Sequence, residues 1–244
     1  MRTIDINSDL GESFGAYTLG EDAEVLQYVT SANIACGFHA SDPLTMQKAV
    51  RQAKAAGVKI GAHPGYPDLV GFGRRELKVS PAELKAMVLY QIGALQAVCR
   101  AEGTKLHHVK PHGAMYNMAA KDEVLALAIA EAVAAFDDSL VLVGLSGSCM
   151  KAAAEAKGLR FAAEVFADRA YEDDGSLVSR TKPGAMIEDE DLAIARMLRL
   201  MTEGVIESVN GREIRPDADT ICVHGDSPRA VAFARRLKES LTAE

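Results

Sequence analysis

Short apolar runs alternate with longer amphipathic stretches along the whole chain. The apolar runs predict β-strands at 4–10, 31–36, 58–62, 106–110, 140–145, 160–166 and 220–224. Apolar residues at helical spacing predict helices after the first strands and again at 122–136, 148–157, 188–203 and 227–241. This alternation indicates a parallel sheet that is covered by helices.

Two further helices are marked by their ends. Asp42 is an N-cap residue for a helix that closes at Gly57. Ser80 and Glu83 form a capping box for a second helix, which ends at Gly103. Both helices therefore lie between predicted strands, as the alternation requires.

Residues 205–214 break this rhythm. Two short apolar segments flank Asn210 and Gly211, a pair typical of a β-hairpin with a type I′ turn. We expect this hairpin to decorate the last crossover. The sequence contains no linker, repeat or low-complexity segment, so residues 1–244 are predicted to form one domain.

Two architectures are consistent with alternating strands and helices. A doubly wound sheet would concentrate its chemistry at one switch point. Here polar residues follow nearly every predicted strand, as at the active-site rim of a β/α barrel, and seven strand–helix units fit the length. We therefore expect a distorted seven-stranded parallel β/α barrel, with the doubly wound sheet as the alternative.

Composition and charge exclude several classes of protein. Lys and Arg number 27 against 34 Asp and Glu, and the net charge of −7 argues against nucleic-acid and anionic-membrane binding. The most apolar stretch is too short to span a membrane, and the first residues lack a signal core. Four scattered cysteines without a CxxC pair are typical of reduced thiols, so a cytoplasmic protein is expected.

The first predicted strand carries polar residues on one face. Alternation places Asp5, Asn7 and Asp9 together, and such groups inside a barrel must be paired, hydrated or functional. Asp9 and Glu12 lie nearer the rim, where a catalytic role is expected. For Asp5, a structural hydrogen-bond network and a functional role both stay open.

Histidines follow the second and third predicted strands. His39 precedes a capped helix, and His63 ends the third strand. Together with Asp9 they are candidate ligands of a divalent metal. The alternative is that each histidine is a structural group with ordinary hydrogen-bond partners.

The fourth predicted strand is the richest in titratable groups. Alternation places His108, Lys110 and His112 on one face and His107 on the other. Lys110 is suited to hold a carboxylate or an oxyanion. The alternative for Lys110 is an internal salt bridge with Asp5 or Asp9, which would still permit a role in catalysis.

The last two strand ends add candidate binding groups. Asp168, Arg169 and Arg180 lie on long segments after the sixth strand, and arginine can bind a carboxylate or phosphate with two hydrogen bonds. A solvated surface pair is the alternative for Arg180. His224 and Asp226 end the seventh strand at the same rim.

Familiar nucleotide and nucleophile motifs are missing from the sequence. It contains no G-x-x-x-x-G-K-[ST] loop, no G-x-G-x-x-G after a strand and no G-x-S-x-G elbow. Acid–base or metal-assisted hydrolysis by Asp, Glu and His is therefore the better interpretation of the rim.

Six segments together resemble one known family. The segments are 7–12, 32–40, 61–64, 109–114, 164–169 and 223–226. In these segments, and along essentially its whole length, the chain resembles the LamB/YcsF family. Ser41 and Ser179 depart from the residues usual at those positions, but neither change removes a reactive group.

The resemblance implies a barrel related to polysaccharide deacetylases. It also implies ATP-dependent opening of 5-oxo-L-proline (pyroglutamate) to L-glutamate, together with separate B and C subunits. ATP would then be handled with the partner subunits, which agrees with the missing nucleotide loop. Self-association into a homo-oligomer stays open.

A division of roles follows as a hypothesis. Asp9, Glu12 or His63 is the base for water, and Lys110 and His112 stabilise the oxyanion. The remaining candidates bind the substrate or complete the site: His39, Asp168, Arg169, Arg180, His224 and Asp226.

Two alternatives remain, a stand-alone metal-dependent deacetylase or amidohydrolase and a non-catalytic lactam-binding subunit. The hypothesis predicts that Asp9→Asn, His63→Ala and Lys110→Met each lower turnover by orders of magnitude and leave folding intact.

Overall fold

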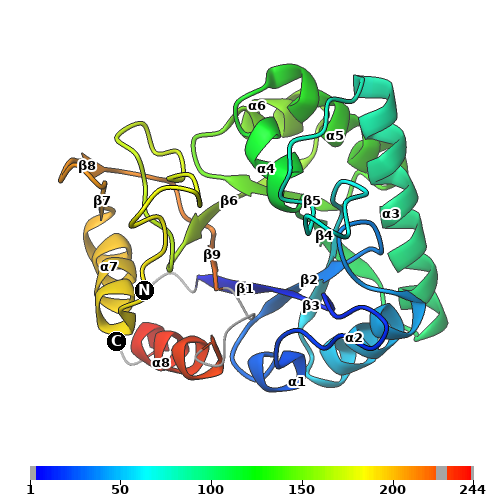
Figure 1. Ribbon diagram of the computed structural model, residues 1–244, viewed down its shortest axis with the longest axis horizontal. Coiled ribbons are helices and arrows are strands. Elements are labelled where there is room, and N and C mark those ends of the chain that lie inside the picture. Colours follow the sequence, from blue (N-terminus) through cyan, green and yellow to red (C-terminus); the bar gives the residue numbers. More distant parts are fainter. Residues whose placement is uncertain (1–3, 224–229, 243–244) are drawn as a thin grey trace.

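The computed structural model describes residues 4–223 and 230–242, and its centre is a closed barrel of seven parallel strands (Figure 1). Around the barrel the strands follow the order β1-β2-β3-β4-β5-β6-β9, and β9 closes it by pairing with both β6 and β1. The strands are β1 (Asp5–Leu10), β2 (Ser31–Ala35), β3 (Lys59–His63), β4 (Leu106–Val109), β5 (Val141–Leu145), β6 (Arg160–Phe166) and β9 (Thr220–Cys222). The predicted barrel is confirmed.

Helices surround this barrel (Figure 1). They are α1 (Asp22–Val25), α2 (Pro43–Ala55), α3 (Pro81–Ala101), α4 (Gly113–Ala119), α5 (Glu123–Phe136), α6 (Cys149–Ala156), α7 (Glu190–Glu203) and α8 (Ala230–Thr242). The N-cap at Asp42 and the capping box at Ser80 are confirmed. Helices α1 and α4 were not predicted, because seven residues or fewer are too short to show a helical period. The predicted start of the last helix at 227 lies outside the described residues.

The strands β7 (Ile206–Glu207) and β8 (Glu213–Ile214) form an antiparallel pair at the periphery of the molecule (Figure 1). The predicted type I′ turn between them is wrong. That turn needs positive φ at both central residues, but of Asn210 and Gly211 only the glycine has it, at 79°. The amide of Ser208 donates to the carbonyl of Arg212 across a three-residue loop. Of these two residues, only Gly211 thus adopts the left-handed conformation, and glycine adopts it with less strain than any other residue.

The apolar core lies between the strands and the helices rather than inside the barrel. Ile34, Val50, Leu95 and Ile129 are completely buried in this layer. None of the helices in the described residues is long and apolar enough to cross a membrane.

The lower interior of the barrel is filled by a polar network. Asp5 accepts hydrogen bonds from the hydroxyls of Thr30 (2.7 Å), Ser31 (2.6 Å) and Thr220 (2.7 Å). Burial raises the pKa of Asp5, but these three donors outweigh it and hold the pKa below its usual value. Of the two roles left open for Asp5, a structural hydrogen-bond network and a functional role, these contacts favour the structural network.

Side-chain amides carry this network upward. The Nδ2 group of Asn7 donates to Thr220 (2.7 Å), and that of Asn33 donates to the side chains of Asn7 and Asp9 (both 2.8 Å). His108 Nε2 lies 2.7 Å from the Oδ1 atom of Asn33. A chain of hydrogen bonds thus links the barrel floor to Asp9.

Gly61 makes room for this network, and we expect Gly61→Ala to lower the free energy of unfolding by about 1–3 kcal/mol. A Cβ at this position would lie 2.1 Å from His108 Nε2, so the imidazole or the strand has to move. Urea denaturation measures the change. Gly93→Ala is the control, since a Cβ there meets nothing within 4 Å and should raise stability by about 0.5–1 kcal/mol. Equal stability of the two variants would contradict this account.

Candidate active site

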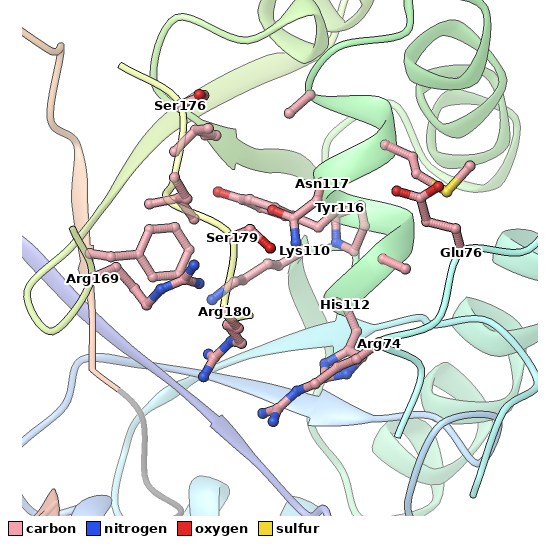
Figure 2. Close-up of a pocket in the computed structure, with 18 of the residues that line it drawn as sticks. Arg74, Glu76, Lys110, His112, Tyr116, Asn117, Arg169, Ser176, Ser179 and Arg180 are labelled. Atoms are coloured by element: carbon pink, nitrogen blue, oxygen red, sulfur yellow. The ribbon is translucent and has the colours of Figure 1, made fainter. Parts of the chain in front are cut away.

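A cavity of about 480 Å³ opens beyond the carboxyl ends of the strands. Its lining includes five predicted catalytic residues, namely Asp9, Glu12, His63, Lys110 and His112. Figure 2 shows Lys110 and His112 in this cavity, with His112 at the start of α4. The carboxyl ends of parallel strands meet at one rim, which explains why residues so distant in sequence converge.

Lys110 lies at the bottom of this cavity and is 2% exposed. Its ammonium nitrogen lies 3.0 Å from Asp9 Oδ1, 2.7 Å from Glu164 Oε1 and 3.1 Å from Asn7 Oδ1. The predicted salt bridge between Lys110 and Asp9 is confirmed. Burial favours the neutral amine, but the neighbouring negative groups hold the pKa of Lys110 well above its usual value. The side chain is therefore a fixed positive charge.

Glu164 was missed as a site residue in the sequence. It lies on β6, is completely buried and accepts a 2.7 Å hydrogen bond from the hydroxyl of Tyr116 in addition to its ion pair. The alternation rule that identified Asp9 on the first strand would also have found this carboxylate inside a strand. Asp9 and Glu164 thus hold Lys110 from two strands.

Four titratable side chains cluster beside the lysine. His63 Nε2 lies 2.9 Å from His112 Nδ1, and it lies 3.3 Å from Asp9 Oδ2. Glu12 Oε1 lies 3.2 Å from His39 Nε2 and 3.6 Å from His112 Nδ1. The residues with ligand atoms within 4.8 Å of one another are Glu12, His39, His63 and His112. Two of the three predicted metal ligands, His39 and His63, belong to this group. The third, Asp9, is not in the group but lies next to it, beside His63.

Burial determines the charges in this cluster. It raises the pKa of Glu12, and it lowers the pKa values of His39 and His112 well below their usual value. Neutral imidazoles beside a carboxylate can accept a proton from water or bind a cation.

His39 lies one layer behind the cavity. It is 1% exposed, and its ring stacks on that of His112 with centroids 3.7 Å apart. A Cβ on Gly65 would approach His39 Nδ1 to 2.6 Å, and a Cβ on Gly73 would meet the Cβ of His39 at 2.7 Å. His39 was predicted to bind substrate, and it lies behind His112 rather than in the lining of the cavity.

Arginines surround the upper part of the cavity. Figure 2 shows Arg74 and Arg180 reaching into this region from two different loops. Arg180 was predicted, whereas Arg74 was missed because nothing in its glycine-rich loop marks the direction of its side chain. Guanidinium groups at a cavity mouth favour an anionic ligand.

Arg169 lines the cavity but is largely committed to the protein. Its guanidinium donates to the carbonyls of Val178 (2.6 Å) and Ala185 (3.4 Å). Burial, followed by repulsion from Arg180, lowers the pKa of Arg169 to about 10. These hydrogen bonds tie Arg169 to the two sides of the loop that carries Arg180.

The remaining predicted binding residues are Asp168, His224 and Asp226. Asp168 is not part of the cavity lining, and its carbonyl accepts a hydrogen bond from the amide of Ile187. His224 and Asp226 lie outside the described residues, so their predicted roles stay predictions.

His108 should make stability depend on pH. Burial lowers its pKa to about 3 in the folded protein from the usual 6.5. As the pH falls below 6.5, the unfolded chain binds a proton that the folded chain does not, so acid favours unfolding. At roughly pH 5 this difference lowers the free energy of unfolding by about 2 kcal/mol.

Denaturant titrations at neutral and acidic pH check this prediction. The control is His108→Gln, which keeps an amide donor for Asn33 but has no titrating group. Its stability should fall less with acid than that of the wild type, by about 2 kcal/mol at roughly pH 5. The same pH dependence in both proteins would contradict the burial of a neutral His108.

Comparisons with known proteins place the chain in a family. Residues 4–244 match the model of the LamB/YcsF family. The A subunit of 5-oxoprolinase from Clostridium beijerinckii is 59% identical over 244 residues, covering 100% of this chain and 96% of the relative. Its counterpart of the same name from Thermococcus onnurineus is 55% identical over 241 residues, covering 99% and 94%.

A solved structure also resembles the whole chain. It is the lactam utilization protein from Thermus thermophilus, with 51% identity and a TM-score of 0.93, covering 98% of this chain and 96% of that one. A family match over nearly the full length and relatives above 50% identity leave no room for another assignment. The chain belongs to the LamB/YcsF family.

Proposed function

We propose that this chain is the A subunit of an ATP-dependent 5-oxoprolinase, which opens 5-oxo-L-proline to L-glutamate together with separate B and C subunits. The observation that carries this proposal is the cavity itself. A carboxylate and an imidazole, Asp9 and His63, lie beside a buried ammonium and below exposed arginines. The names of the relatives point to the same reaction.

The substrate of this reaction matches the cavity in size and charge. 5-Oxoproline is a small ring with one amide and one carboxylate, and a cavity of about 480 Å³ holds it with room for water. Arg74 and Arg180 are placed to bind the carboxylate of the substrate or a phosphate. The lactam ring then faces Asp9, His63 and Lys110.

Opening the ring consumes one water molecule. Its oxygen attacks the lactam carbonyl carbon, the ring C–N bond breaks, and one proton of the water ends on the nitrogen that leaves as an amine. Asp9 and His63 are the groups that take and return this proton. The positive charge of Lys110 stabilises the negative charge that develops nearby.

ATP supplies the driving force through the partner subunits. An unstrained amide resists water, and transfer of a phosphoryl group to its oxygen, which converts ATP to ADP, makes the carbonyl carbon reactive. Water attack at this carbon breaks the ring C–N bond and leaves an acyl phosphate of glutamate, and a second water molecule cleaves that acyl phosphate to glutamate and phosphate. The sequence contains no familiar nucleotide-binding loop, which supports binding of ATP by the other subunits. Four free cysteines support a cytoplasmic location.

Complementation of an extract that lacks only this chain tests the proposal. Glutamate release from labelled 5-oxoproline is measured with ATP, before and after the chain is added. We expect release only when both the chain and ATP are present, and none from the chain alone. Unchanged release on adding the chain would overturn the proposal. Hydrolysis by the chain alone, without ATP, would instead favour a stand-alone amidohydrolase.

A further inference from the structure

Backbone carbonyls determine which ring nitrogens of two histidines carry hydrogen. His63 Nδ1 lies 2.7 Å from the carbonyl oxygen of Lys110, and His112 Nε2 lies 2.8 Å from that of Phe72. A carbonyl oxygen only accepts hydrogen bonds, so each of these nitrogens is the donor. In a neutral imidazole the other nitrogen is then a bare acceptor. His63 Nε2 and His112 Nδ1 are those bare nitrogens.

These two acceptors face each other and are surrounded by further acceptors. They are 2.9 Å apart. The carboxylate oxygens nearest to them are Asp9 Oδ2, at 3.3 Å from His63, and Glu12 Oε1, at 3.6 Å from His112. Lone pairs at such distances repel each other unless a cation lies among them. A proton on one of the two nitrogens would make a hydrogen bond in only one of these three close contacts.

We propose that Glu12, His39, His63 and His112 form a binding site for a divalent transition-metal ion of the zinc class. Zinc binds imidazole nitrogen and carboxylate oxygen at about 2.0–2.2 Å, which places neighbouring ligand atoms about 3–3.5 Å apart. The observed separations of 2.9, 3.2 and 3.6 Å among these side chains cover that range. Three imidazoles favour a transition metal over Mg²⁺ or Ca²⁺, which prefer oxygen ligands.

The surroundings hold the ligands in place before any ion binds. Metal-binding histidines usually donate their second ring N–H to a carbonyl or carboxylate, as His63 and His112 do. Phe72 has a φ of 55°, an uncommon conformation for a bulky residue. It directs its carbonyl to His112, and such strained residues cluster at functional sites. Gly73, the next residue, leaves the space that the stacked rings of His39 and His112 occupy.

The site is open on one side. Glu12, His63 and His112 line the cavity, so an ion can enter and keep a position for water or a carbonyl oxygen. A metal there would polarise the lactam carbonyl or lower the pKa of a bound water. The inference rests on the proposed function for this role, but metal binding itself is measured without turnover.

Metal analysis of the full-length chain is the first test. The protein is purified without chelator, its metal content is measured, and it is then stripped and titrated with Co²⁺ and Zn²⁺. We expect one ion per chain and visible Co²⁺ absorption bands of a nitrogen-ligated site, which Zn²⁺ abolishes. No saturable binding of either ion would overturn the proposal, and NMR spectra with both nitrogens of His63 protonated would then show that a proton occupies the site instead.

Variants then locate the ion. His112→Ala, His63→Ala and Glu12→Gln should each weaken Zn²⁺ binding by more than about 100-fold, because even loss of an outer partner costs about 10–100-fold. His107→Ala is the matched control, since His107 precedes the inward-facing His108 on the same strand and lies outside the cluster. Circular dichroism verifies folding, and Glu12→Gln covers the case in which an alanine variant misfolds. Equal affinity in Glu12→Gln and His107→Ala would refute this ligand set.

The two proposals fail in different ways. One bound ion in a chain that does not restore glutamate release would leave the metal site standing and remove the proposed function. Restored release by a chain that binds neither ion would leave the proposed function standing and remove the metal site.

Discussion

Lys110→Met should lower the free energy of unfolding by about 3–5 kcal/mol and abolish turnover of the complex. The ammonium group is the shared partner of Asp9 and Glu164, and all three groups are largely or completely removed from water. Methionine fills a similar volume but leaves two buried carboxylates without their cation. Denaturant titration measures the loss. The sequence-based expectation that this variant folds unharmed is therefore not supported by the geometry.

A double variant separates charge from packing. Glu164→Gln removes one of the two carboxylates, so Lys110→Met combined with Glu164→Gln should be more stable than Lys110→Met alone. The recovery should be at least about 1 kcal/mol, the penalty for leaving a buried charged group unpaired. If Lys110→Met were as stable as the wild type, the ion-pair account of the barrel interior would be wrong.

Asp9→Asn should lower turnover of the reconstituted complex by about 100–10,000-fold and leave the chain folded. The amide has nearly the shape of the carboxylate, and Lys110 keeps Glu164 as a partner. The variant has lost, however, the negative group 3.3 Å from His63 that accepts or directs the proton. Glutamate release by the complex gives the rate, and thermal melting gives the stability.

Asp5→Asn is the matched control for this prediction. Both carboxylates lie on β1 and face the barrel interior, but Asp5 bonds to three hydroxyls at its floor. Asp5→Asn should therefore lower stability and change turnover little at a temperature where the variant is folded. A similar loss of turnover in both variants would show that the rate follows the integrity of the barrel rather than the chemistry of Asp9.

Local patterns were enough to predict the architecture. Period-two alternation identified the strands and their inward faces, and cap residues such as Asp42 and Ser80 placed helix starts. Strand ends of a parallel barrel share one rim, so the convergence of Asp9, His63 and Lys110 followed as well. The strands and the helix starts could be predicted because alternation and capping depend on neighbours in the chain, and the shared rim then follows from the parallel topology that they indicate.

Side-chain partners were harder to predict. Arg169 was expected to bind an anion, yet its guanidinium donates to carbonyls of its own loop. His39 was expected at the substrate, yet it lies behind His112. Arg74 carried no sequence signal at all. In each case the residue type was informative, but the direction of the side chain depends on loops that have no periodic pattern.

The sequence by itself determined the seven-stranded barrel, its family and most of the titratable residues at its rim. Only the tertiary structure decided that Asp5 bonds to three hydroxyls at the barrel floor while Asp9 lines the cavity, and that Glu12 and His112 lie in one cluster with His39 and His63. The physical reason is how far apart in the sequence the interacting residues lie. Alternation and capping act between neighbours in the chain, whereas the ion pair between Lys110 and Asp9 joins residues 101 positions apart. Such pairs exist only once the barrel has closed.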